Sequence, residues 1–273
     1  MSDHIKSMQL YPRAERIYAD LEALGYGPGA PVPIEVLNQF DQLHYHGTEA
    51  LDAAIAACGM AAGQRVLEVG SGWGGCARYL AQRSGAALDA VELQEDYHHV
   101  AQDLTARAGL TDHVTHVNAD FLEVAVPEAG YDHAVSWLAL FHIPDRPRYL
   151  AKIHASLKPG GALFAEDLYL IKPPTDPQDF ARHLFPNSLV SREDYEASLQ
   201  EAGFDAPLLT DMTQDWAHFT ADRLQAFRAA RPDYEARHGT DGYAALHLFY
   251  DKMASYFADG VVGGLRLSAR KPV

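Results

Sequence analysis

The sequence predicts an α/β protein built on one largely parallel sheet, and three observations support this prediction. Apolar runs of strand length alternate with helical segments from residue 65 to residue 170. A glycine-rich turn, "EVGSGWGG", joins the first of these strands to the first of these helices. The 273 residues, 48% of them hydrophobic, can bury one large core. Parallel neighbours need long crossover connections, so the alternation indicates a doubly wound sheet with helices on both faces.

Turn residues and capping residues set the expected bounds of each element. Glycine or proline ends most of the helices, and Thr48 and Ser191 are expected to be N-caps of the helices that follow them. The expected strands are 65–70, 87–93, 113–120, 131–140, 162–170, 205–212 and 263–271, the last at or near an edge. The expected helices are 11–24, 48–58, 76–85, 94–110, 146–157, 191–204 and most of 215–258.

Changes in composition and in the strand–helix pattern divide the chain into a cap and a main domain. Residues 1–58 are expected to form an N-terminal helical cap or lid, and residues 59–273 the sheet domain. Within that domain, the proline-rich stretch 172–190 interrupts the alternation and predicts a lid insert. Residues 212–258 are expected to form a helical region on the substrate side of the sheet.

The charge and cysteine content narrow the classes of partner. Against 37 Asp and Glu there are 22 Lys and Arg, a formal net charge of −15. Such a surface repels phosphate backbones and anionic lipids, so we expect neither nucleic acid nor membrane as a partner. Two cysteines and the lack of an apolar leader favour a cytoplasmic location. A homodimer is one assembly that the sequence leaves open.

The glycine loop predicts a cofactor that contains a nucleoside. Gly70 and Gly72 allow tight turns and close approach of a ligand. The loop presents free N–H groups at the carboxyl end of its strand, where open α/β sheets bind ligands. Glu92 ends the second strand, and an acid at that place can accept hydrogen bonds from both ribose hydroxyls.

Two cofactors compete for this loop. Gly70, Gly72 and Gly75 satisfy the dinucleotide pattern G-x-G-x-x-G, which would indicate an NAD-dependent oxidoreductase. Gly70, Gly72 and Gly74 equally fit the E-x-G-x-G-x-G loop of S-adenosylmethionine enzymes. Glu68 favours the second, because an acid there is unhelpful near a pyrophosphate but suits an ammonium and a sulfonium. The oxidoreductase would also need a catalytic Tyr-x-x-x-Lys or an equivalent, which is not seen.

On these motifs the chain resembles the class I S-adenosylmethionine-dependent methyltransferases. More narrowly, it is similar to the group that methylates small molecules, which includes sarcosine/dimethylglycine, phosphoethanolamine and natural-product methyltransferases. The resemblance spans roughly residues 40 to 271 and rests on "VLEVGSGWGG", "VEL", "NADF", "YDHAVSWLALFHIPD", "LKPGG", "SREDYEASLQEAGF" and "GGLRLSARKP". It implies a Rossmann-like sheet of seven strands whose last strand is antiparallel.

The resemblance also implies roles for individual residues. The residues implied to wrap the methionine half of the cofactor are Glu68, Gly70, Gly72 and Gly74. Glu92 would bind the ribose, Leu93 would pack against the adenine, and Asp120 with Phe121 would contact the adenine edge and face. The reaction would transfer a methyl group to a small-molecule acceptor, with an amine nitrogen preferred to a carbon or oxygen acceptor.

The segment "FDQLHYHGTEA" contains an H-x-H pair just upstream of the glycine loop. By the resemblance, Tyr45 caps the cofactor and takes part in the active site, and His44 and His46 lie near the methyl group or the acceptor. Two other interpretations remain: a structural helix entry, or a metal site. The metal interpretation needs at least one more converging ligand, so no metal is expected.

Further candidates lie at the rim of the predicted sheet. His142 follows the fourth strand and would either face the methyl group or make a structural hydrogen bond. Glu166, in the fifth strand, would hold an acceptor ammonium or be a solvated acid. His183, in the lid insert, would contact the acceptor. A histidine of near-neutral pKa could remove a proton from an amine. The predicted catalytic residues are therefore His46 and His142, together with Tyr45.

Overall fold

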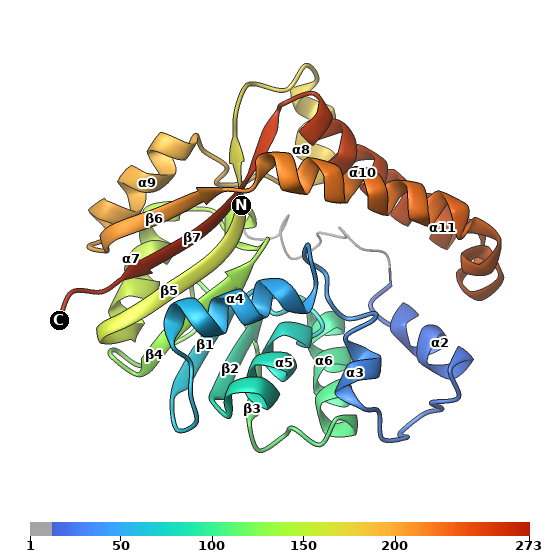
Figure 1. Ribbon diagram of the computed structural model, residues 1–273, viewed down its shortest axis with the longest axis horizontal. Coiled ribbons are helices and arrows are strands. Elements are labelled where there is room, and N and C mark those ends of the chain that lie inside the picture. Colours follow the sequence, from blue (N-terminus) through green and yellow to red (C-terminus); the bar gives the residue numbers. More distant parts are fainter. Residues whose placement is uncertain (1–12) are drawn as a thin grey trace.

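A computed structural model describes residues 13–273, and a single seven-stranded sheet runs through its centre (Figure 1). The strand order is β3-β2-β1-β4-β5-β7-β6. The strands are β1 (Arg65–Val69), β2 (Ala87–Glu92), β3 (Val114–Asn118), β4 (Tyr131–Trp137), β5 (Leu157–Leu170), β6 (Asp205–Asp211) and β7 (Val262–Arg270). Only β7 is antiparallel to its neighbours, β5 and β6, and it lies one place from the edge. The predicted fold class and the antiparallel last strand are confirmed.

Helices cover both faces of the sheet (Figure 1). The helices are α2 (Arg16–Ala23), α3 (Ile34–Leu37), α4 (Thr48–Cys58), α5 (Gly75–Ser84), α6 (Glu95–Arg107), a 3₁₀ turn η1 (Leu140–His142), α7 (Arg146–Ser156), α8 (Pro177–Leu184), α9 (Arg192–Glu201), α10 (Thr213–Ala229) and α11 (Arg231–Ala258). One core cluster joins the sheet to α7 and α9, and a second joins it to α4 and α5. This is the three-layer arrangement that buries both faces of a parallel sheet.

Several local predictions differ from the structure. Thr48 is the first residue of α4 and makes no side-chain cap, because Gly47 at φ +49° occupies the N-cap. Ser191, by contrast, accepts a hydrogen bond from the backbone N–H of Asp194, as a capping serine should. No helix is predicted within the insert 172–190, but it contains α8, whose N-cap Asp176 accepts two backbone hydrogen bonds.

The N-terminal helices pack against α6 and the glycine loop. Residues of α2 and α3 share a hydrophobic cluster with α6 and with Trp73 of the glycine loop. Arg107, at the end of α6, donates hydrogen bonds to the carbonyls of Tyr26, Gly27 and Ala30. These contacts fix a helical cap against α6, as the fold prediction expected. The first part of the predicted helix 11–24 and of the predicted lid lies outside the described residues.

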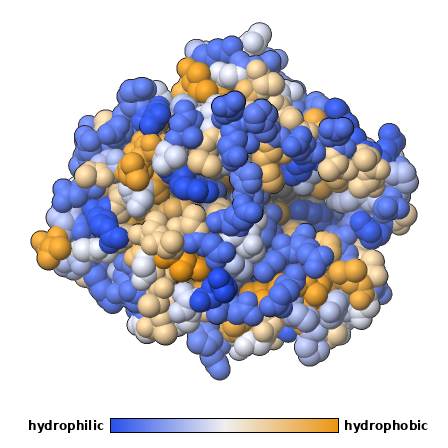
Figure 2. Space-filling view, in the orientation of Figure 1, coloured by the Kyte–Doolittle hydropathy of each residue, from blue (hydrophilic) through white to orange (hydrophobic). Residues whose placement is uncertain are grey.

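The visible face is largely hydrophilic, with smaller hydrophobic areas between the polar side chains (Figure 2). The large hydrophobic residues most exposed in the described chain are Leu24, Ile171, Leu208, Leu248 and Val273, which come from separate elements. Within residues 13–273, no helix has both the length and the apolar character needed to cross a bilayer.

Candidate active site

One large cavity lies at the carboxyl ends of β1, β2 and β4. Chain order reverses between β1 and β4, and an open α/β sheet binds its ligands at such a point. The residues that line the cavity come from the cap, the glycine loop, the ends of the strands, α8 and α11. They include the predicted residues Glu68, Gly70, Gly72, Glu92, Leu93, Asp120, Phe121, His44, Tyr45 and His142.

The glycine loop is held close to the strand ends. The backbone N–H groups of Gly70 and Ser71 both donate to the carbonyl of Val91, at 2.9 and 3.1 Å. Gly70 has φ +77°, and a Cβ atom there would lie 2.3 Å from the Cβ of Ala139. Neither the backbone conformation nor the space admits a side chain. The loop can therefore approach a ligand only because this position is glycine.

Gly74 has a different place from the other two glycines of the pattern. It is the N-cap of α5, with φ +71°, and it does not line the cavity. A Cβ atom there would lie 2.5 Å from Cε1 of His116 on β3. In this structure the third glycine lets α5 pack closely against the sheet.

Glu68 brings an unpaired carboxyl oxygen to the cavity. The residue is 1% exposed, and its Oε2 atom has no hydrogen-bond partner. Burial is the main cause that raises the pKa of Glu68 to about 8. A buried acid with a free acceptor atom is suited to a cationic ligand group, which would supply the missing partner.

Glu92 and the residues after β2 and β3 form the opposite wall. Glu92 accepts hydrogen bonds from the N–H of Gly72 at 2.7 Å and of Gln94 at 2.9 Å, and desolvation raises its pKa. A carboxylate has about four acceptor positions, so capacity for further donors remains. Asp120 accepts the N–H of Leu122, and Phe121 is almost fully buried. These groups fit a ribose and a flat heterocycle.

The H-x-H segment divides between the cavity and its support. Tyr45 lines the cavity, and its ring meets Trp216 edge-on at 5.0 Å. His44 also lines it and is held by the carbonyl of Tyr45 and by Gln42, while burial lowers its pKa to about 4. His46, at φ +58°, packs on Phe219 and does not line the cavity.

A carboxylate, that of Asp215, lies close to the His46 ring. The Nε2 atom of His46 lies 2.6 Å from Oδ2 of Asp215, but the two groups are not aligned for a hydrogen bond. Within residues 13–273, no group of three or more His, Cys, Asp or Glu side chains could hold a metal ion.

His142 is the rim histidine that the cavity includes. Its Nδ1 atom lies 3.0 Å from the carbonyl of Phe185, so Nδ1 carries the proton and Nε2 the lone pair. Burial lowers the pKa of His142 to about 4. The expectation of a near-neutral pKa is therefore wrong for this residue. His142 is a neutral hydrogen-bond acceptor at physiological pH and a weaker base than predicted.

The two remaining rim candidates lie outside the cavity lining. Glu166 is 1% exposed and is paired with Arg266, with contacts of 2.6 and 2.7 Å. His183 on α8 contacts its own helix, through the carbonyl and carboxylate of Asp179. Neither side chain lines the cavity.

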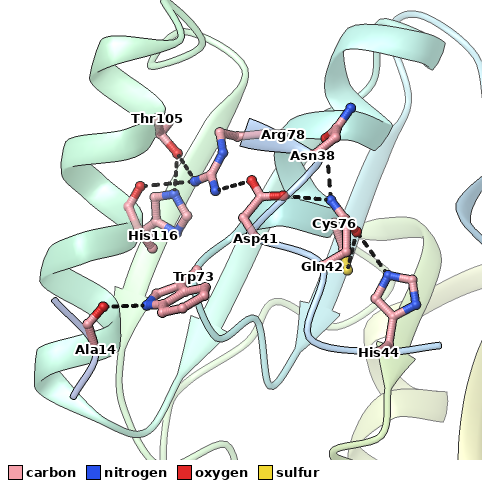
Figure 3. Close-up of polar contacts among 11 residues, drawn as sticks. Ala14, Asn38, Asp41, Gln42, His44, Trp73, Cys76, Arg78, Thr105 and His116 are labelled. Carbon is pink, nitrogen blue, oxygen red and sulfur yellow. Dashed lines mark hydrogen bonds and ion pairs between the residues drawn. The ribbon is translucent and has the colours of Figure 1, made fainter. Parts of the chain in front are cut away.

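The sequence does not predict a buried polar network that lies beneath the glycine loop (Figure 3). Arg78 of α5 pairs with Asp41 at 2.8 Å, and both side chains are fully buried. Arg78 also donates to Thr105, which bonds His116. On the other side, Gln42 contacts Asp41 and His44. The network ties the cap segment to α5 and α6, and no local signal marks it because its two charges lie 37 residues apart.

The sequence is similar to those of known methyltransferases. A family described as "Methyltransferase domain" matches residues 66–161. The 27-O-demethylrifamycin SV methyltransferase of Amycolatopsis mediterranei (strain S699) is 26% identical over 235 residues, covering 82% of this chain and 84% of its own. Phosphoethanolamine N-methyltransferase 3 of Arabidopsis thaliana is 27% identical over 66% of this chain and 37% of its own.

A solved structure shows the same fold. Phosphoethanolamine N-methyltransferase 2 of Haemonchus contortus, in complex with S-adenosyl-L-methionine, superposes with a TM-score of 0.82 at 20% identity. The match covers 99% of this chain and 60% of that one. The domain match begins in β1 and runs through the glycine loop into β5, so it includes the part of the cavity lining between Glu68 and Pro144. The chain contains a methyltransferase domain over residues 66–161 and has the fold of the class I S-adenosylmethionine-dependent methyltransferases.

Proposed function

We propose that this chain transfers a methyl group from S-adenosylmethionine to a nitrogen of a small-molecule acceptor. The observation that carries the proposal is a neutral imidazole, His142, in the same cavity as the glycine loop and Glu92. A second candidate is transfer to an oxygen or carbon of a natural product, which the relative that acts on 27-O-demethylrifamycin SV favours. The net charge of −15 supports a small molecule over nucleic acid as the acceptor.

The cofactor, when bound, supplies an electrophilic methyl group on a sulfonium. We propose that Glu68 and the backbone of Gly70 and Gly72 hold its methionine half and that Glu92 holds its ribose. Leu93, Asp120 and Phe121 would surround the adenine. Gly74 would act from behind the loop, through the packing of α5.

The chain's own contribution to the reaction is to position the acceptor and to exclude water. Tyr45, almost fully buried among aromatic rings, would close the cavity over the reacting groups. His142 would accept a hydrogen bond from the acceptor through Nε2. Residues 1–58 and 172–190 would form a lid, and α8 is tied to α11 by Asp179 and Lys252 at 2.7 Å.

Candidate acceptors incubated with the protein and S-adenosylmethionine should gain the mass of one methyl group. Replacement of His142 by alanine should lower turnover about 100-fold, because a misplaced acceptor loses near-attack geometry. Affinity for S-adenosylhomocysteine should be unchanged. His46→Ala is the comparison, and it should cost less than about tenfold, since His46 packs on Phe219 outside the cavity lining. A larger loss of turnover in His46→Ala than in His142→Ala would contradict this assignment of roles.

Cofactor binding at pH 7 should release about one proton from Glu68. With its pKa raised to about 8, the free carboxyl is mostly protonated at pH 7, and a bound cation favours the carboxylate. Affinity should therefore rise with pH until the free protein has lost this proton, near pH 8. The same raised pKa means that stability falls as pH rises through it. Calorimetry in buffers of different ionisation enthalpy measures the release.

The matched variants for this experiment are Glu68→Gln and Glu49→Gln. The first should abolish proton release, and the second, on the exposed side of α4, should retain it. Equal release in both variants would assign the proton to another group.

A further inference from the structure

We infer that the methyl acceptor is a predominantly apolar molecule that carries no phosphate or carboxylate and is held between β5, α8 and α11. The inference rests on the proposed function, since it assigns the acceptor to the half of the cavity that the cofactor residues do not line. Its grounds are the side chains of that half, the charges around it and the backbone of Leu138.

The wall of this half is built from apolar side chains of five separate segments. Its members are Leu138, Phe141, Leu168, Leu184, Phe249 and Met253. All of them belong to, or pack against, one hydrophobic cluster that also contains Tyr45 and Trp216. A ligand that removes such a surface from water gains free energy roughly in proportion to its own apolar area. A small zwitterion could not use this wall.

The charges around the cavity disfavour an anionic acceptor. Of the described residues that line it, none is lysine or arginine, whereas Asp41, Glu68, Glu92 and Asp120 are all acidic. Recognition of phosphate or carboxylate normally uses arginine or lysine donors. With no basic side chain among its described lining residues, the cavity offers an anion no charged partner.

Two basic side chains near this half are held in ion pairs, and a third, Arg223 of α10, lies over the ring of Tyr45 outside the cavity lining. Lys252, next to Met253 on α11, donates to Asp179 at 2.7 Å. Arg266 on β7 is bound to the buried Glu166. An anionic acceptor that bound Lys252 or Arg266 would have to break an ion pair and leave a carboxylate unpaired, which is costly where the carboxylate is buried.

The backbone of Leu138 is strained where it meets the cavity. Leu138 has φ +52°, a left-handed conformation that a bulky residue rarely adopts. Its N–H donates to the carbonyl of Glu166 at 2.7 Å, which holds the conformation in place. Such strain persists where the surroundings impose it and is concentrated at functional sites. Here it keeps a leucine in the cavity wall, beside Ala139 and the glycine loop.

Binding can be measured without methyl transfer. Protein loaded with S-adenosylhomocysteine is titrated by calorimetry with 3-phenylpropylamine, 3-phenylpropanol, phosphoethanolamine and sarcosine. Both phenyl probes should bind, with a negative heat-capacity change, and at least about tenfold more tightly than phosphoethanolamine, which carries a net negative charge, and the zwitterion sarcosine. Tighter binding of phosphoethanolamine or sarcosine overturns the inference, and so does failure of both phenyl probes to bind.

Two lysine substitutions on neighbouring residues of α11 sharpen the experiment. Phe249 lines the cavity, whereas Leu248 is 44% exposed on the same helix and does not. Phe249→Lys should weaken binding of 3-phenylpropanol about tenfold and strengthen binding of phosphoethanolamine. Leu248→Lys should change neither, and S-adenosylhomocysteine affinity should be equal in both variants, which controls for folding. Equal effects of the two substitutions on the phenyl probe contradict the inference.

The proposed function can fail separately from this inference. If the phenyl probes bind as expected but no amine gains a methyl group, the apolar acceptor class stands and transfer to nitrogen does not. If sarcosine or phosphoethanolamine is methylated in preference to every apolar amine, the proposed function stands and the acceptor class is wrong.

Discussion

Gly70→Ala should weaken S-adenosylhomocysteine binding by about 100-fold. A left-handed conformation costs a residue with a Cβ atom about 1–2 kcal/mol, and overpacking costs about 1–3 kcal/mol more. At φ +77°, the new Cβ would lie 2.3 Å from the Cβ of Ala139, so the loop must move away from the strand ends. That movement displaces the N–H groups that would face the cofactor. Isothermal titration calorimetry measures the loss.

The control for this substitution is Gly160→Ala. Gly160 has the same φ of +77°, but a Cβ atom there would come no closer than 3.8 Å to another atom, the Cγ2 of Val273. The position is far from the cavity lining, so this variant carries the conformational cost without the overlap. It should lose about 1–2 kcal/mol of stability and keep its cofactor affinity. An equal loss of affinity in both variants would mean that the overlap with Ala139 is unimportant.

Arg78→Met should destabilise the protein by about 3–5 kcal/mol, the cost of leaving a buried partner charge uncompensated. Arg78 and Asp41 are both 0% exposed in their side chains and lie 2.8 Å apart. The substitution also removes the hydrogen bonds that Arg78 donates to Thr105 and to the carbonyl of Ala101. The loss should appear in the free energy of unfolding by urea, measured with the slope of the transition checked against wild type.

Two further variants show whether the effect comes from the buried charge. Adding Asp41→Asn to Arg78→Met should restore part of the stability, because the unpaired charge is removed. Glu123→Ala breaks the exposed pair between Arg148 and Glu123, whose charged atoms lie 2.9 Å apart, and should cost less than about 1 kcal/mol. A loss of similar size from the exposed pair would contradict the argument from burial.

The same network explains how the cap can influence the cofactor site. Asp41 lies in the segment between α3 and α4 and also lines the cavity, while Arg78 lies in the helix that follows the glycine loop. A buried charge pair has to keep its geometry, so it fixes the position of the cap segment relative to α5. In the Arg78 variant we expect the position of His44 and Tyr45 to be lost along with stability.

Strand and helix positions could be predicted from the sequence because they follow from hydrophobic periodicity and from turn and capping residues. β1 and α4 lie within a residue of their expected bounds, and Ser191 caps α9 as predicted. Errors arose where a residue type permits two local roles. Thr48 suited an N-cap, but Gly47 could adopt φ +49° and took that place. The proline-rich insert still formed α8, because Pro177 is tolerated in the first turn of a helix.

The sequence by itself determined the parallel sheet, the glycine loop and the acids around it, since each is written in consecutive residues whose spacing fixes one face or one turn. Only the tertiary structure decided which rim residues share a cavity and in what charge state. It separated His142 from Glu166 and His183, lowered the pKa of one histidine and raised that of Glu68, and joined Arg78 to Asp41. The physical reason is that desolvation and charge pairing depend on neighbours brought together by folding from distant parts of the chain.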